Sequence, residues 1–312
     1  MEIRKCPNCG SKNISILYEN AKDLSYLKEG KFNLLKCKLC DLEFISPLLN
    51  EKKLQKYYPP KDYYSFKNKN LVSSIYHNIS SYYYSKKRGL LKILIFPFKS
   101  LLHRYYLESE KSILEIGCGD GKILKIYKKH GMKTAGIEPY GNNLTEEEES
   151  LGIVRNSIEK SNFKEESFDF IILKDAIEHI PKQKMLLAKC RKWLKKGGKL
   201  IFTTQNTKSL WKFIFGRYWF GYDVPRHVYN YDKKSIVIFL RNNGFEIKKI
   251  RLYDVSYMPI GSMKFWRTDK TNTNKHPLIY NNLTKIIFLP ISLIVTWMGL
   301  GSLMEVVAEK NN

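Results

Sequence analysis

The sequence predicts an α/β fold, a doubly wound sheet preceded by a small cysteine-bearing domain. An apolar strand pattern at residues 113–116 runs directly into a glycine turn, and a helical pattern follows at 122–130. Further strand patterns stand at 134–137 and 167–172, as expected for a sheet built from repeated strand–helix units. Two Cys-x-x-Cys pairs precede residue 50. A chain of 312 residues is long enough for one full α/β domain and a small accessory unit.

The glycine turn, residues 117–121, indicates a ligand site. Gly117, Gly119 and Gly121 can adopt positive φ and carry no Cβ, so the backbone can approach a ligand closely. The helix that follows directs its positive N-terminal end to the same place. The spacing is G-x-G-x-G, and Lys122 occupies the position where the dinucleotide fingerprint needs its third glycine. The turn therefore departs from the pattern typical of NAD-binding proteins.

Two acidic residues next to this turn indicate what kind of ligand it binds. Glu115 precedes the turn, where a carboxylate would repel a pyrophosphate but can accept hydrogen bonds from an ammonium group. Glu138 follows the strand pattern at 134–137, at the place where an acidic residue binds ribose hydroxyls in nucleotide-binding sheets. Together they predict a nucleoside that bears an amino acid.

With these motifs the sequence resembles the class I S-adenosylmethionine-dependent methyltransferases. The match continues in order through a strand at 167–172, a loop at 175–180, and a helix end, glycine turn and strand at 194–202. A Trp-x-x-x-Asp-x-Pro-Arg-His segment at 219–227 is similar to a subgroup that methylates small molecules, quinones or sugars. The resemblance implies a seven-stranded Rossmann-like sheet within residues 109–312, closed by an antiparallel strand at 302–310.

The resemblance also implies S-adenosylmethionine as the cofactor and a set of residues that bind it. Many relatives carry an aspartate that binds the adenine amino group, and here Ser157 or Asn156 stands at that position. Backbone groups and weaker polar contacts are therefore expected to bind the adenine. The expected cofactor-binding residues are Glu115, Gly117, Cys118, Gly119, Gly121, Glu138, Ser157, Ile158 and Lys174.

Two histidines are candidate catalytic bases. Methyl transfer to a hydroxyl or carbon acid requires removal of a proton, and histidine suits this task near neutral pH. His179 follows the strand at 167–172, at the sheet edge where ligands bind, although Glu178 and His179 could instead order this loop. His227 lies in the 219–227 segment beside an acid and a cation. The remaining histidines are expected on the surface or in packing: His77, His103, His130 and His276.

The N-terminal cysteines predict a zinc ribbon in residues 1–50. Two Cys-x-x-Cys pairs, Cys6 with Cys9 and Cys37 with Cys40, can supply four thiolates to one tetrahedral Zn²⁺. All four ligands would come from the protein, so the zinc would stabilise the fold and take no part in catalysis. Redox-active dithiols are the alternative. The other two cysteines, Cys118 and Cys190, are expected to be small buried residues.

Residues 51–108 predict a basic, aromatic helical arm. Tyrosines cluster at 57–58, 63–64 and 82–84, and the stretch 90–104 is both apolar and basic. Such a helix can lie in a membrane interface or cap the active site.

The stretch Ile286–Met304 contains no charged residue and by length alone is a candidate membrane span. Because Pro290 and two glycines interrupt it, and a strand is expected at 302–310, we predict a helix near 286–298. A helix of that length is too short to cross a bilayer, so it either packs internally or lies in the interface.

A net charge of +24 suggests an anionic partner, either lipid headgroups or nucleic acid. The two apolar stretches favour a small, sugar- or lipid-linked acceptor methylated at an anionic membrane surface. The alternatives are an RNA methyltransferase that uses the basic surface and the ribbon, or an enzyme of the same sheet type that binds NAD or a nucleotide sugar. The N-terminus does not read as a secretory signal. We therefore expect a cytoplasmic protein, peripheral on the inner face of the membrane.

Overall fold

A computed structural model of the chain describes residues 5–58, 71–86, 89–96, 99, 102–140, 143–276, 278–279 and 281–311. Tyr63 and Tyr64 of the predicted arm lie outside these residues. The chain folds into two compact units. Unit 1 comprises Met1–Tyr58, Ile177–Gln183 and Thr203–Val306, and unit 2 comprises Pro59–Ala176, Lys184–Phe202 and Val307–Asn312. The domain boundaries predicted at residues 50 and 108 stay predictions.

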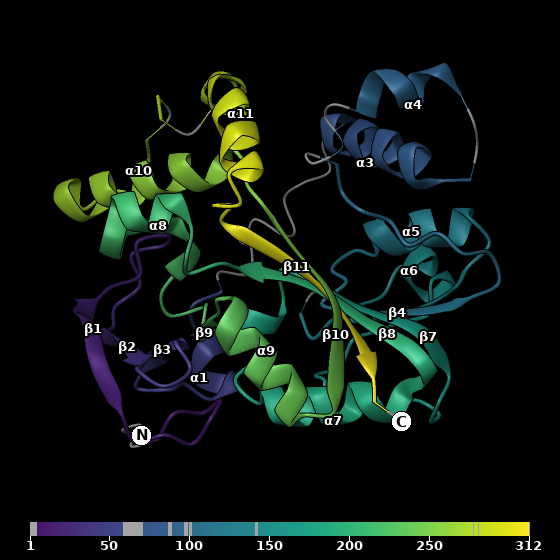
Figure 1. Cartoon of the computed structure of the whole chain (residues 1–312), viewed down its shortest axis with the longest axis horizontal. Helices are drawn as coiled ribbons and strands as arrows, with labels where there is room; N and C mark the ends of the chain where they lie inside the picture. Colours follow the sequence, from purple (N-terminus) through teal and green to yellow (C-terminus); the bar gives the residue numbers. More distant parts are fainter. Residues whose placement is uncertain are drawn as a thin grey trace. The chain divides into compact units, whose positions relative to one another are not determined.

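A seven-stranded sheet has the order β10-β11-β8-β7-β4-β5-β6 (Figure 1). In the centre, β4 is parallel to both β5 and β7, and Ile113 lies opposite Thr134 on one side and Phe170 on the other. The predicted α/β fold and its last strand are thus confirmed. The strands are β4 (Ser112–Ile116), β5 (Lys133–Ile137), β6 (Ile153–Val154), β7 (Phe168–Lys174), β8 (Leu194–Gln205), β10 (Phe245–Tyr253) and β11 (Leu303–Lys310).

The helices of unit 2 begin where the sequence offers a cap or a turn. The helix α5 (Lys122–Lys129) begins after Gly121, whose φ is 72°, and α6 (Glu146–Ser150) begins with a capping box between Thr145 and Glu148. Apolar residues of β4, β7 and β8 pack with Tyr105 and Tyr127 into a buried cluster. Cys118 and Cys190 are both buried, as expected. The other helices are α3 (Leu71–Tyr84), α4 (Leu90–Ile95) and α7 (Gln183–Trp193).

A four-stranded sheet in unit 1 has the order β1-β2-β3-β9. Three strands belong to the cysteine-bearing segment: β1 (Ile14–Ala21), β2 (Phe32–Cys37) and β3 (Glu43–Ser46). The fourth, β9 (Tyr229–Asn230), comes from much later in the chain and pairs antiparallel with β3, Phe44 lying opposite Tyr229. The sheet of the cysteine-bearing segment therefore includes a strand from the segment that follows His227.

The remaining elements of unit 1 are helical. Short 3-10 turns lie at or before the candidate site residues: η2 (Ile177–His179) contains His179, and η3 (Gly216–Tyr218) and η4 (Phe220–Tyr222) precede His227. The α-helices are α1 (Glu51–Gln55), α8 (Leu210–Phe215), α9 (Lys233–Asn242), α10 (Tyr257–Thr271) and α11 (Asn282–Trp297). Figure 1 shows α8, α10 and α11 lying together.

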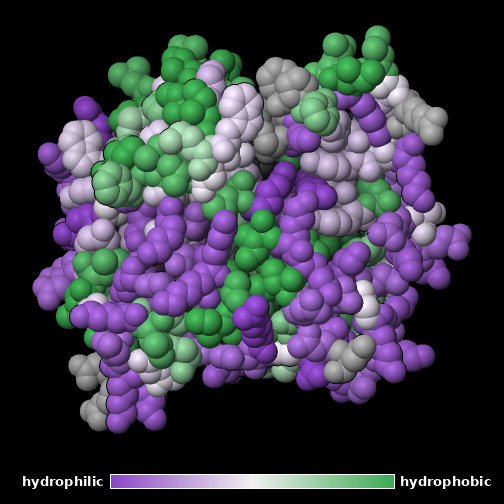
Figure 2. Space-filling model, viewed as in Figure 1, coloured by the Kyte–Doolittle hydropathy of each residue, from purple (hydrophilic) through white to green (hydrophobic). Residues whose placement is uncertain are grey.

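The helix α11 begins earlier than predicted, because Asn281 and Thr284 form a capping box ahead of the apolar run. Apolar side chains cover much of its outer surface in Figure 2. Among the helices that the structure describes, none is both long enough and apolar enough to cross a membrane.

Candidate active site and zinc centre

The glycine turn in unit 2 is shaped by the end of β5. The amide of Gly117 donates to the carbonyl of Ile137 at 2.8 Å. The buried Glu138 carboxylate accepts from the amides of Gly119 (2.9 Å) and Tyr140 (3.0 Å). Each oxygen of Glu138 keeps a lone pair for a further donor, such as a ribose hydroxyl. Glu138 therefore holds the turn and can still bind a nucleoside.

The glycines of the turn differ in what surrounds them. A Cβ on Gly119 would meet no atom within 4 Å, whereas a Cβ on Gly121 would lie 2.7 Å from side-chain carbons of Leu151 and Ile153. Gly119 thus borders open space that a ligand can fill, and Gly121 is needed for packing and for its positive φ. The Cys118 thiol packs with Leu124, Leu151 and Ile153 in a buried cluster. The Cys118 side chain therefore contributes to the packing beneath the turn.

Glu115 is suited to a cationic ligand. It is 2% exposed, and within the described residues its Oε2 atom is buried with no hydrogen-bond partner. Burial raises the pKa of Glu115 to about 8, opposed by the charge of Lys174. A buried, unpaired carboxyl oxygen is destabilising unless a donor binds it. The ammonium group of S-adenosylmethionine would supply that donor, so these residues fit the cofactor.

Lys174 ends β7 beside a histidine that the sequence analysis had assigned to surface or packing. Its Nζ lies 2.8 Å from Nδ1 of His103, and Nδ1 of His77 lies 2.9 Å from the hydroxyl of Tyr105. Burial, with the charge of Lys174 as a smaller cause, lowers the pKa of His77 to about 3. The contact between His103 and Lys174 could not be predicted, because nothing in the local pattern of His103 indicates contact with a strand that ends 71 residues later.

The remaining expected cofactor residues lie after β6. Ile158 is buried, and Ser157 is partly exposed beside the exposed Asn156. Arg155, which the sequence analysis also missed, donates from Nη1 to the carbonyl of Gly119 at 3.1 Å and from Nη2 to Glu148 at 2.5 Å. Arg155 thus binds the carbonyl of Gly119, the residue whose amide donates to Glu138.

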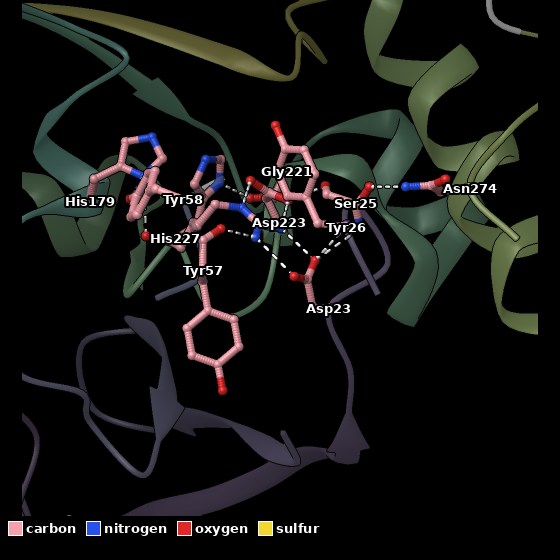
Figure 3. A network of polar contacts seen from close by, with 11 residues as sticks. Asp23, Ser25, Tyr26, Tyr57, Tyr58, His179, Gly221, Asp223, His227 and Asn274 are labelled. Atoms are coloured by element: carbon pink, nitrogen blue, oxygen red, sulfur yellow. Dashed lines mark hydrogen bonds and ion pairs between the residues drawn. The ribbon is translucent and has the colours of Figure 1, made fainter. Parts of the chain in front are cut away.

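The two candidate bases meet in unit 1 (Figure 3). The rings of His179 and His227 lie 4.6 Å apart between centroids, at an interplanar angle of 75°. Nδ1 of His227 is 2.6 Å from the carbonyl of Gly221. Nδ1 of His179 is 3.1 Å from the carbonyl of Arg226 and 2.9 Å from the hydroxyl of Tyr58.

These carbonyls assign the protonation of both rings. A carbonyl can only accept, so Nδ1 of each ring carries a hydrogen. Burial, and secondly the neighbouring His227, lower the pKa of His179 to about 3. His179 is therefore neutral at neutral pH. The Nε2 atom of His179 is therefore unprotonated, the form that can accept a proton.

Asp223 and Arg226, the acid and the cation next to His227, belong to a buried ion-pair network. Arg226 is fully buried and donates from Nε and Nη2 to Asp223 (2.8 and 2.7 Å) and from Nη1 and Nη2 to Asp23 (3.1 and 2.7 Å). Nη1 also donates to the carbonyl of Tyr57 at 3.0 Å, and the guanidinium lies over the ring of Tyr26. The guanidinium outweighs burial and holds the pKa of Asp223 well below its usual range. Both charges are thus paired within this buried network.

The four N-terminal cysteines form a second centre. The sulfurs of Cys6 and Cys40, and those of Cys9 and Cys37, are each 3.6 Å apart, and all four lie within 4.8 Å of one another. Disulfide sulfurs would be about 2.0 Å apart. Four thiolates at about 2.3 Å from Zn²⁺ would be about 3.8 Å apart. Nδ2 of Asn8 approaches the Cys40 sulfur at 3.7 Å. The cluster thus fits a structural zinc.

Glu178 adds an acidic group to the histidine pair. One ligand atom each from Glu178, His179 and His227 lies within 4.8 Å of the others. The Glu178 carboxylate also accepts from Nε2 of Gln205 at 2.7 Å.

The sheet order and the glycine turn define a class I S-adenosylmethionine-dependent methyltransferase. Residues 93–250 match a family model described as "Methyltransferase domain", and the chain belongs to this family.

Several relatives are named ubiquinone biosynthesis O-methyltransferase. The mitochondrial protein of Rattus norvegicus is 26% identical over 184 residues, covering 53% of this chain and 52% of that protein. A protein of Saccharophagus degradans is 24% identical over 166 residues, covering 49% and 70%. The chain thus spans about half the length of the rat relative.

Solved structures resemble this chain at low sequence identity. The 1,6-didemethyltoxoflavin-N1-methyltransferase of Burkholderia thailandensis has a TM-score of 0.48 and 10% identity, covering 91% of this chain and 97% of that one. A SAM-dependent methyltransferase of Archaeoglobus fulgidus has a TM-score of 0.41 and 17% identity, covering 77% and 100%.

Proposed function

We propose that this protein methylates a hydroxyl group of a small, sugar- or lipid-linked acceptor, with S-adenosylmethionine as the methyl donor. The observation that carries the proposal is the histidine pair, in which backbone carbonyls hold the hydrogen of each ring on Nδ1. The relatives support an oxygen acceptor, because both are named O-methyltransferases.

In this proposal His227 is the general base. Burial keeps the pKa of His179 at about 3, which makes His179 a poor proton acceptor. His227 takes the hydroxyl proton on Nε2, while Gly221 accepts the hydrogen bond from Nδ1 and stabilises the imidazolium that forms. Glu115 binds the ammonium group of the cofactor and Glu138 the ribose, beside the open space at Gly119. When bound, S-adenosylmethionine supplies an electrophilic methyl group on its sulfonium.

The test is product analysis. Sugar and lipid extracts are incubated with the protein and with S-adenosylmethionine labelled in its methyl group, and labelled products are identified by mass. We expect methyl ethers of a sugar- or lipid-linked hydroxyl. His227→Gln should lower the transfer rate by a factor of about 10² to 10⁴, and His130→Gln, a change at the end of α5, serves as the matched control. Methylated RNA as the main product, or equal losses in both variants, would contradict the proposal.

We further propose that the protein acts at an anionic membrane surface. Exposed apolar residues of α11 recur three or four positions apart, which places them along one side of the helix. Its inner side carries the buried Ser292 and Val295. Between residues 255 and 304 the sequence has five basic residues, and Asp269 is its single acidic residue. The exposed residues of this face are Leu283, Ile286, Ile287, Ile291, Ile294, Trp297 and Met298 (Figure 2).

Vesicle sedimentation tests the membrane proposal. We expect binding to anionic vesicles that high salt weakens but does not abolish, because apolar burial persists when charges are screened. Replacing Ile287, Ile294 and Trp297 by Ser should release the protein, whereas Ile16→Ser, at an exposed isoleucine of β1, should not. Binding that is unchanged by the triple replacement, or that falls steeply with salt to nothing, would refute this face as the contact.

A further inference from the structure

The segment that follows the zinc ribbon supplies a hydroxyl to one of the two histidines. Tyr58 lies just after α1, and its hydroxyl is 2.9 Å from Nδ1 of His179, with the two rings in edge contact (Figure 3). The preceding residue is anchored twice. The Tyr57 carbonyl accepts from Nη1 of Arg226 at 3.0 Å, and its hydroxyl donates to the carbonyl of Glu29 at 2.8 Å. Tyr58 is thus held against His179 by its neighbours in the chain.

The direction of the Tyr58 hydrogen bond follows from the Arg226 carbonyl. That carbonyl lies 3.1 Å from the same Nδ1 atom and can only accept, so Nδ1 of His179 carries the hydrogen. Tyr58 then accepts a share of this N–H bond through its phenolic oxygen. The Arg226 carbonyl and the Tyr58 oxygen thus both accept from Nδ1 of His179. Together they stabilise the tautomer in which Nε2 of His179 is unprotonated.

Arg226 connects this tautomer to the ribbon. Its carbonyl faces His179, while its guanidinium is bound by Asp23, which lies between β1 and β2. The N-terminal segment thus contacts His179 directly through Tyr58 and indirectly through Asp23 and Arg226. The closed four-cysteine pattern predicts a purely structural role for the ribbon, and these contacts extend that role to the histidine pair.

We propose that Tyr58 is a positioning residue for the histidine pair, which fixes the tautomer of His179 and thereby the direction of its dipole beside the His227 ring. The proposal rests on the proposed function for its kinetic consequence, but the tautomer itself can be observed without catalysis. One hydrogen bond to a neutral group changes a population by about threefold to tenfold.

The experiment compares Tyr58→Phe with the unaltered protein, each labelled with ¹⁵N in histidine. Two-bond proton–nitrogen correlation spectra distinguish rings protonated on Nδ1 from rings protonated on Nε2. We expect the share of Nε2-protonated His179 to rise about threefold to tenfold in Tyr58→Phe. The transfer rate kcat should fall by a similar factor and its pH profile should shift, while the affinity for S-adenosylmethionine measured by calorimetry stays the same.

Tyr218→Phe is the matched control, because it removes a phenol hydroxyl whose bond goes to Asp269 and not to either histidine. An unchanged His179 spectrum in Tyr58→Phe overturns the proposal, whether or not activity falls. An equal spectral change in Tyr218→Phe overturns it as well. A shifted tautomer in a protein that methylates no sugar, lipid or RNA acceptor would support the positioning role and reject the proposed function.

Discussion

Arg226 donates to both carboxylate oxygens of Asp23, a residue 203 positions earlier in the chain, at 3.1 and 2.7 Å. Both side chains are buried, and Asp223 binds the same guanidinium. Ser25 and Tyr26 donate their amides to Asp23, so the carboxylate is well satisfied. The network thus joins the loop after β1 to the segment that carries His227.

Asp23→Ala should therefore be strongly destabilising. Removing one partner of a buried ion pair leaves an uncompensated charge, which costs about 3–5 kcal/mol in the free energy of unfolding. Glu246→Ala, which removes an exposed partner of Lys248, should cost less than about 1 kcal/mol. Urea unfolding of both variants measures the difference. Equal unfolding midpoints would show that the Arg226 network does not carry this stability.

The glycine turn and the acidic residues that flank it were predictable from sequence because their determinants are local. Apolar residues specify β4, positive φ requires glycine, and the acid after β5 follows at short range. The partners of Arg226 were not predictable, since Asp23 is distant in the chain and no periodic pattern marks it. The same holds for Tyr58, which meets His179 only through the fold, and for β9, a strand of two residues. His179 and His227 could each be predicted as a candidate base, but the contact between their rings could not be predicted.

Two glycines of the same turn should respond differently to alanine. Gly119→Ala places a Cβ in open space, so the cost to folding is limited to the left-handed backbone, about 1–2 kcal/mol. It should nevertheless weaken S-adenosylmethionine binding at least tenfold, because the Cβ occupies the space that the ligand needs. Gly121→Ala adds a clash with Leu151 and Ile153 at 2.7 Å and should cost more stability. Calorimetric titration and thermal unfolding of both variants decide this, and a Gly119→Ala protein with normal affinity would remove the turn from the cofactor site.

Cofactor binding should release a proton near pH 7. Burial raises the pKa of Glu115 from 4.5 to about 8, so the carboxyl group is protonated in the free protein at neutral pH. The ammonium group of the cofactor favours the carboxylate, and binding therefore ionises Glu115. Affinity should rise with pH between about 6 and 7.5, where the α-amino group of the cofactor is still charged. Above the folded pKa the proton release should vanish.

Glu115 affects the stability of the free protein with the opposite dependence on pH: the affinity for the cofactor rises with pH, whereas the free energy of unfolding falls. Without cofactor the folded protein keeps a proton on Glu115 that the unfolded chain loses above its ordinary pKa of 4.5. This group therefore lowers the free energy of unfolding as pH rises from about 4.5 to about 8. Calorimetry of S-adenosylmethionine binding in two buffers of different ionisation enthalpy measures the released proton. Glu115→Gln should abolish the release, and the same release in that variant would assign it to another group.

The cysteine cluster should hold one zinc ion per chain in protein purified without chelators. The sulfur–sulfur distances of 3.6 Å fit a tetrahedral site, and closed sites of this kind contribute folding free energy locally. Cys37→Ser should lose the zinc and lower the stability of unit 1. The affinity for S-adenosylmethionine should remain nearly unchanged, because Glu115, Gly119 and Glu138 belong to unit 2. Cys190 is a buried cysteine outside the cluster, so Cys190→Ser should retain the metal.

Metal analysis by mass spectrometry checks both variants. Absence of zinc from the unaltered protein would favour the redox-dithiol alternative, and a second equivalent that persists in Cys37→Ser and disappears in His227→Gln would show that Glu178, His179 and His227 bind a cation.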